Sequence, residues 1–127
     1  LGRSARGTEI TVWHLRAEIA ALHATAADAT ATDWPRIVAV YEELLELDSS
    51  PVVELARAVA IGKTQGAAAA LAMLPALDGN PYLHAARGVY LSELGRKDEA
   101  RRQLERARDL ARTAPERRLM EHRIEAL

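Results

Sequence analysis

The 127-residue sequence contains no cysteine and no phenylalanine, and aromatic residues make up only 4% of it. Without cysteine the chain has no disulfide bond, no thiolate zinc site and no thiol nucleophile. With so few aromatics, a hydrophobic core has to be built from Ala, Leu, Val and Ile. Ala and Leu are strong helix formers. The composition therefore predicts an all-α protein whose helices approach one another closely.

Excess charge and long hydrophobic runs are also absent. The formal net charge is −1 and the pI is near 6.5, which argues against a protein that binds nucleic acid or membranes by bulk charge. No apolar run approaches the roughly 18 residues of a membrane helix, and we expect no secretory leader. We expect a soluble, cytoplasmic, single-domain chain of residues 1–127. It starts at Leu1 with a polar, linker-like stretch over residues 1–7, which indicates a piece of a longer protein.

Hydrophobic spacing and capping residues predict about seven helices. In the first, an apolar stripe recurs at alternating spacings of three and four, at Val12, Leu15, Ile19, Leu22 and Ala26. Ser50–Pro51, Asn80–Pro81 and Thr113 with Glu116 are typical helix starts. The seventh helix is expected to turn Leu119, Met120, Ile124 and Leu127 inward. The expected ranges are 8–26, 33–47, 51–62, 66–74, 81–94, 97–112 and 114–127.

A 33-residue echo relates two parts of the chain. Its members Gly62, Ala67, Leu71 and Leu74 return as Gly95, Ala100, Leu104 and Ala107. A period near 33 with two helices per unit is typical of helical repeats, which bury their apolar faces by stacking. It predicts antiparallel hairpins of helices one and two, three and four, and five and six, with the seventh helix as a cap. The alternative register, which pairs helix two with three and four with five, stays open.

Two resemblances extend this interpretation. One segment of the chain resembles a tetratricopeptide repeat. It contains Gly88, Leu91, Gly95, Ala100, Leu104 and Ala107. The second resemblance covers more of the chain and is more specific. Several short segments look like the carboxy-terminal extension of a subgroup of bacterial extracytoplasmic-function sigma factors. These segments are residues 16–26, 32–38, 50–53, 57–60, 84–87 and 94–96.

The sigma-factor resemblance implies a fold and a role. The fold is a short, right-handed, tetratricopeptide-like solenoid, and the role is a non-catalytic interaction or regulatory domain in transcription initiation. The implied partners are the amino-terminal sigma domains, which this chain lacks, RNA polymerase or a regulator. DNA would be reached only through the parent sigma factor. An alternative to this role is that the chain is a free-standing tetratricopeptide-like adaptor, outside any sigma factor. At Ala56 the sequence departs from the Asn of the family pattern, which removes a polar group from the expected groove.

A binding groove is expected along the first helix of each pair. Its small and apolar surface suits an amphipathic helix, although a neighbouring helix of the same chain would cover it equally well. The candidate groove residues are Ile19, His23, Val52, Ala56, Tyr82, Ala85 and Val89.

Basic residues gather towards the carboxyl end. Residues 1–95 carry 7 basic and 11 acidic side chains, and residues 96–127 carry 10 and 7, so the net charge changes from −4 to +3. The simplest interpretation is two solvated helices with interleaved charges. The alternative is a DNA-contact module with phosphate contacts from Arg101, Arg102, Arg106, Arg108, Arg112, Arg117, Arg118 and Arg123.

Metal and catalytic chemistry find little support. No two of His14, His23, His84 and His122 are three or four residues apart, so no metal site is predicted. His23 and His84 are expected to be buried and hydrogen-bonded. Gly62-Lys63-Thr64 lacks the upstream glycine of a phosphate-binding loop, and Gly62 is expected to end a helix. The acidic cluster Glu42, Glu43, Glu46 and Asp48 is interpreted as an exposed rim. We expect no enzyme activity and no cofactor.

Overall fold

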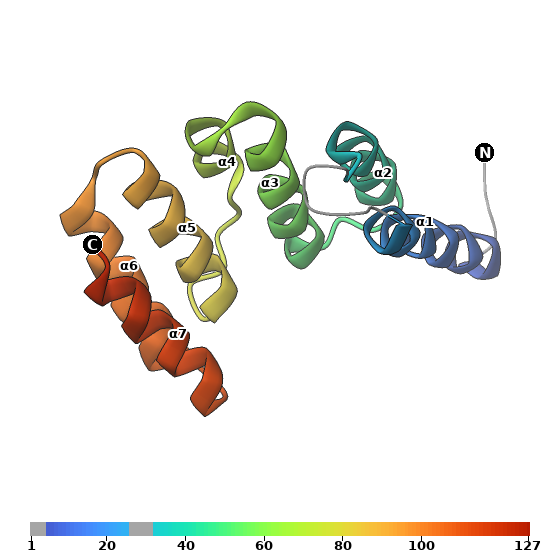
Figure 1. Ribbon diagram of the computed structural model, residues 1–127. Coiled ribbons are helices and arrows are strands. Elements are labelled where there is room, and N and C mark those ends of the chain that lie inside the picture. The colour runs from blue at the N-terminus through green and yellow to red at the C-terminus, as the bar shows by residue number, and fades with distance from the viewer. Residues whose placement is uncertain (1–4, 26–31) are drawn as a thin grey trace.

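The computed structural model describes the backbone of residues 5–25 and 32–127, and the side chains of residues 12–22 and 32–127. These residues form seven α-helices and no strands (Figure 1), which confirms the all-α prediction. The helices are α1 (Ala5–Thr25), α2 (Trp34–Leu47), α3 (Pro51–Gln65), α4 (Ala67–Met73), α5 (Pro81–Glu93), α6 (Lys97–Leu110) and α7 (Ala114–Glu125).

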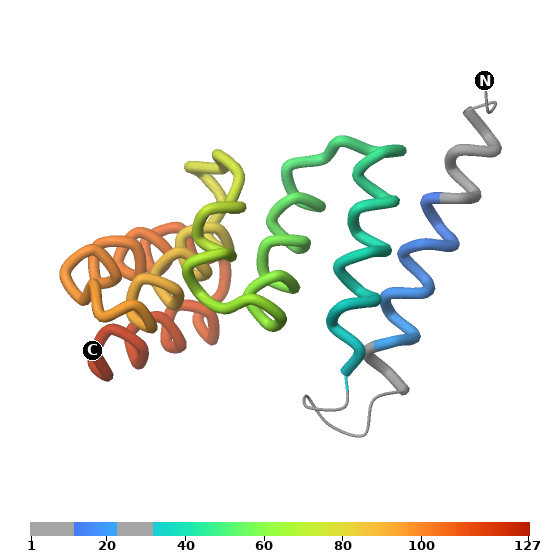
Figure 2. Tube along the Cα trace, turned by 90° about the horizontal axis from the view of Figure 1, so that it is seen from above, coloured from blue at the N-terminus to red at the C-terminus, as the bar shows by residue number. Residues whose placement is uncertain are grey.

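Each helix packs mainly against the helices that precede and follow it in the sequence. Figure 2 shows the consequence, an extended row that runs from α1 at one end to α6 and α7 at the other. Two separate hydrophobic clusters follow from this local packing. The cluster of α1, α2 and α3 contains Leu15, Ile19, Ile37, Val40, Leu44, Val53 and Ala60. The cluster of α6 and α7 contains Leu104, Ala107 and Met120.

Side-chain caps determine where several helices begin. The Asp33 carboxylate accepts the Arg36 N–H at 3.2 Å, and Asn80 Oδ1 accepts the Tyr82 N–H at 2.8 Å. Thr113 Oγ1 accepts the Glu116 N–H at 3.2 Å. A proline stands in the first turn of α2, α3, α5 and α7. Because these signals are local, the predicted starts of α2, α3, α5 and α7 are confirmed within about one residue.

Some predicted boundaries differ. The linker predicted over residues 1–7 already belongs to α1 from Ala5 onward, while residues 1–4 lie outside the described residues. The last residue of the predicted stripe, Ala26, lies outside them as well. In α7, Met120 is buried as predicted, but Leu119 is 47% exposed. The inward position predicted for Leu119 is therefore wrong, because nothing in the described chain packs on that side of α7.

Gly62 does not end a helix. The α3 helix continues to Gln65 and ends at Gly66, whose φ of 92° favours glycine. Gly62 lies inside α3, where an added Cβ would stand 3.0 Å from Tyr90 Oη and 3.1 Å from Ala70 Cβ. A methyl group at this position would crowd the side chains of Ala70 and Tyr90, so Gly62 lets α4 and α5 lie close to α3.

The helix starts recur at 30 residues rather than at the predicted 33. The α3 and α5 helices begin 30 residues apart, at Pro51 and Pro81, and so do α4 and α6. Burial repeats at the same distance, from Val53, Ala58 and Ile61 to Leu83, Gly88 and Leu91. A sequence signal for it exists and was missed, since Ala56, Arg57, Val59, Ala70 and Leu74 return as Ala86, Arg87, Val89, Ala100 and Leu104.

We predict that Gly88→Ala destabilises the fold by about 1–2 kcal/mol. The added Cβ would lie 2.7 Å from two side-chain carbons of Leu104, which is 1% exposed and has little room to move. Overpacking costs about 1–3 kcal/mol, more than the roughly 1 kcal/mol that alanine adds to a helix. Urea unfolding followed by circular dichroism measures the change. Gly79→Ala is the control, because its Cβ would meet nothing within 4 Å. Equal stability of the two variants would contradict the prediction.

Candidate functional site

Open clefts lie between successive odd-numbered helices. The amino-terminal cleft, between α1, α2 and α3, encloses about 300 Å³. Three predicted groove residues, Ile19, Val52 and Ala56, line it together. The middle cleft, between α3 and α5, encloses about 240 Å³ and includes Val89.

A longer groove runs between α5 and α7, and we call it the C-terminal groove. It consists of two adjoining clefts of about 260 Å³ each, which share Arg123. Tyr82 and Ala85 line the cleft near the start of α5 and α7, and Val89 lines the cleft near their ends. The α6 helix packs against both α5 and α7 and forms the floor.

The predicted groove residues thus lie in separate clefts. Ile19 is buried by other helices of the same chain, whereas Val52 and Tyr82 are 60% and 55% exposed. The side chain of His23 lies outside the described residues. The other predicted groove residues do line clefts along α1, α3 and α5. These clefts are separate neighbours and do not form the single groove that was predicted.

A hydrogen bond joins the two walls of the C-terminal groove at one end. The Tyr82 hydroxyl donates to Glu116 Oε1 at 3.4 Å, and Glu116 Oε2 accepts the Arg112 backbone N–H at 3.3 Å. The second contact differs from the predicted capping box, because the carboxylate meets the N–H of Arg112 instead of that of Thr113. The Glu116 charge is therefore partly neutralised by donors, while the exposed rings and methyl groups of Tyr82 and Leu119 form the rim.

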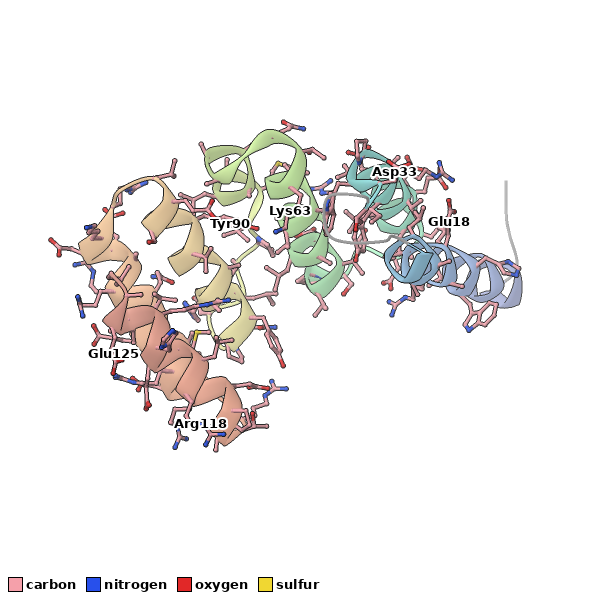
Figure 3. All side chains as sticks on the ribbon, in the orientation of Figure 1. Glu18, Asp33, Lys63, Tyr90, Arg118 and Glu125 are labelled. Carbon is pink, nitrogen blue, oxygen red and sulfur yellow. The ribbon has the colours of Figure 1, made fainter. Side chains whose placement is uncertain are left out.

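Each cleft has a basic residue in its lining. These basic residues differ in whether another side chain contacts their charged group. Arg16 lies 3.5 Å from Asp48. Lys63 stands 5.9 Å from the centre of the Trp34 ring, in the middle of Figure 3. Within the part of the chain that the structure describes, half-buried Arg123 makes no hydrogen bond or ion pair. Among the basic groups of the clefts, its guanidinium is the one without such a contact in the described residues.

The other arginines of the DNA alternative are not among the residues that line these clefts. Those on α6 and α7 are mostly exposed, and Arg108 contacts Asp109 at 3.2 Å. Arg118 and Arg123 are five residues apart on α7, which places them roughly 140° apart around the helix axis. Figure 3 shows Arg118 at the far end of α7 from Glu125. The exposed members are Arg101, Arg102, Arg106, Arg112, Arg117 and Arg118.

His84 is buried and hydrogen-bonded, as predicted. Its Nε2 lies 2.5 Å from the main-chain carbonyl of Asp78, and its Nδ1 lies 2.8 Å from the side-chain amide of Gln103. A neutral ring satisfies both contacts when Nε2–H donates and the Gln103 NH2 faces Nδ1. This imidazole fastens the start of α5 to the preceding turn and to α6. His14 and His122 are exposed.

The acidic cluster predicted on the second helix is mostly exposed. Glu42, Glu43 and Glu46 are exposed on α2, which confirms the predicted rim, whereas Asp48 is half-buried and meets Arg16. In the described ranges, no group of three acidic or histidine side chains is placed to hold a metal ion. Nor does any described helix have the length and hydropathy to cross a membrane.

Burial affects two tyrosines next to the clefts. It raises the pKa of Tyr41, an effect that nearby Arg16 partly opposes. Burial also raises the pKa of Tyr90, and the Glu93 carboxylate adds to that increase. Both phenols are therefore neutral in the folded protein at ordinary pH, and Tyr90 Oη lies against the backbone of Gly62.

Comparison with known proteins finds a longer relative of the chain. No family model matches it, and no solved structure matches it. An uncharacterized protein of Rhizobium meliloti (strain 1021) is 46% identical to it over 108 residues. The match covers 82% of this chain and 26% of the relative, so the chain spans about a quarter of that protein's length. The name of the relative assigns no activity.

We predict that His84→Ala lowers the free energy of unfolding by about 2–3 kcal/mol, because it removes two hydrogen bonds, leaves their partners unsatisfied and opens a void. Thermal unfolding measures the loss. Exposed His122→Ala is the matched control and changes stability by less than about 0.5 kcal/mol. A His84 variant as stable as the control would show that the imidazole does not hold α5 in place.

Alkaline pH should weaken the fold through the tyrosines. When folding raises the pKa of a tyrosine, the free energy of unfolding is unaffected below the unfolded pKa of about 10. It decreases as the pH rises further, through the folded pKa. Urea midpoints should therefore be level from pH 8 to about 10 and fall above that. Tyr90→Phe cannot ionise at this position and should reduce the fall. An unchanged alkaline profile in Tyr90→Phe would rule out this role for Tyr90.

Proposed function

We propose that this chain is a non-catalytic protein-interaction domain of an extracytoplasmic-function sigma factor, acting in transcription initiation. The observation that carries the proposal is the set of similar strings between residues 16 and 96, in the order of that family's carboxy-terminal extension. In the uncharacterized relative the matching segment makes up 26% of the protein, which leaves room there for further domains.

The proposal includes a finer fold, a right-handed, tetratricopeptide-like solenoid. Its support is the 30-residue recurrence that relates α3 and α4 to α5 and α6. Clefts between α1 and α3, α3 and α5, and α5 and α7 fit a stack in which the odd-numbered helices share one face. In this arrangement α7 is the capping helix, with Leu119 exposed at the rim of the C-terminal groove.

The clefts support the choice of a protein partner. They are lined mainly by Ala, Val, Leu and Tyr, with few polar groups, which suits apolar side chains of another chain. The proposed partners are the sigma core- and promoter-binding domains of the same protein, RNA polymerase or a regulator, in the cytoplasm. The proposal needs no metal ion and no cofactor.

A second candidate is a DNA-contact module, which the exposed arginines of α6 and α7 favour. It predicts binding of the chain to duplex DNA with an affinity that falls steeply with salt, because phosphate contacts release counterions. Acidic neighbours on the same helices, such as Asp109 and Glu121, weigh against it. Absence of a mobility shift at low salt would eliminate this candidate.

The test of the sigma-factor proposal begins with the coding sequence upstream of Leu1, which should encode sigma core-binding and promoter-binding domains. Those domains, purified separately, should then be retained by the tagged 127-residue chain, and RNA polymerase should be retained with them. His84→Ala, which loosens α5, should weaken retention at temperatures where it unfolds. An upstream sequence without sigma domains would remove the transcription part of the proposal and leave the interaction part standing.

A further inference from the structure

The C-terminal groove differs from the other two clefts in its charge. In the amino-terminal cleft Arg16 meets Asp48 at 3.5 Å, and in the middle cleft Lys63 lies over Trp34. In the C-terminal groove Arg123 lines both adjoining clefts and, within the described residues, has no partner. A half-buried guanidinium between apolar walls is poorly compensated, so a ligand carboxylate there gains a charge-assisted hydrogen bond.

On either side of Arg123 the groove is apolar. The cleft near the start of α5 and α7 is walled by Ala85, Ala107 and Met120, with Tyr82 and Leu119 at its rim. Its volume of about 260 Å³ has room for one large side chain such as Leu or Phe. The other cleft has the same volume and is lined by apolar groups that include Val89, Leu104 and Leu127.

The two clefts are separated by a distance that suits a helix. Their lining residues are displaced by about eight positions along α5 and about six along α7, which corresponds to roughly 9–12 Å at 1.5 Å per residue. Positions i and i+7 of an α-helix lie on one face, roughly 10 Å apart. A residue at i+3 or i+4 then falls between them, opposite Arg123.

We propose that the C-terminal groove binds an amphipathic helix of a partner protein that carries two large apolar side chains seven positions apart and an Asp or Glu between them. The apolar side chains fill the two clefts, and the carboxylate pairs with Arg123. The inference rests on the interaction function proposed above and is independent of the sigma-factor context.

Nucleic acid fits this groove less well. A phosphate would suit Arg123, but the clefts on both sides are largely apolar, and successive phosphates along a backbone would meet Glu116 in one cleft and Glu93 in the other, whereas a single carboxylate is needed only at Arg123 between them. Glu116 already accepts hydrogen bonds from Tyr82 and Arg112, so it offers little repulsion to a carboxylate that is held further along at Arg123.

Fluorescence anisotropy with synthetic peptides tests the inference. The probe is a fluorescein-labelled, alanine-based helical peptide with leucines at i and i+7 and glutamates at i+3 and i+4. One control peptide has lysines in place of the glutamates, and another has alanines in place of the leucines. The intact 127-residue chain should bind the probe at least about tenfold more tightly than either control.

Matched variants locate the contact. Arg123→Glu should weaken binding of the glutamate peptide by about tenfold or more and strengthen binding of the lysine peptide. Arg118→Glu makes the same charge change on another face of α7 and should change either affinity by less than about threefold. Circular dichroism melts check that both variants fold. Arg123→Met removes the charge without reversing it and replaces the first variant if that variant unfolds.

Three results would overturn the inference. They are no binding of the probe, equal binding of the glutamate and lysine peptides, and equal effects of the Arg123 and Arg118 variants. Displacement of the probe by a labelled duplex DNA would make nucleic acid the occupant and would also overturn it. Retention of sigma domains by the same chain is measured separately, so failure here is distinguishable from failure of the proposed function.

Discussion

Small residues at the helix crossings set how closely each helix approaches the next one in sequence, and the clefts depend on that spacing. Gly88 lets Leu104 of α6 pack directly against the backbone of α5. The same Leu104, with Ala107, also packs in one cluster with Met120 of α7. Because α6 lies under both neighbours, α5 and α7 stand apart above it and leave the C-terminal groove between them. A row of helices with sequential contacts therefore creates clefts without a large central core.

Polar contacts hold the walls of that groove in place. The start of α5 is capped by Asn80 and fastened by His84 to the preceding turn and to α6. The start of α7 is capped by Thr113 and joined to α5 through Glu116 and Tyr82. These bonds engage the polar groups at the start of α5 and α7. Within the described residues Arg123 makes no hydrogen bond or ion pair, so the apolar groove carries an uncompensated guanidinium between its two clefts.

Local features of the fold were predictable, and long-range features were not. The starts of α2, α5 and α7 follow from a capping side chain and a proline, which act within one turn. Gly62 was misinterpreted because a glycine that ends a helix and a glycine that allows close approach look alike in sequence. What distinguishes them is Tyr90, 28 residues away. The 33-residue offset aligns Gly62 with Gly95, although Gly62 lies inside α3 and Gly95 follows α5 with a φ of 78°.

The candidate site divides in the same way. The sequence placed Tyr82, Ala85 and Val89 on one face of a helix, because helical periodicity depends only on spacing, and it indicated that α6 and α7 are basic. Only the tertiary structure decided that Leu119 stays exposed and that, within the described residues, Arg16 and Lys63 have partners while Arg123 has none. Helix boundaries and faces arise from neighbours within a few residues. The pairing of a charge depends on side chains that distant segments bring together, and those are known only once the helices have packed.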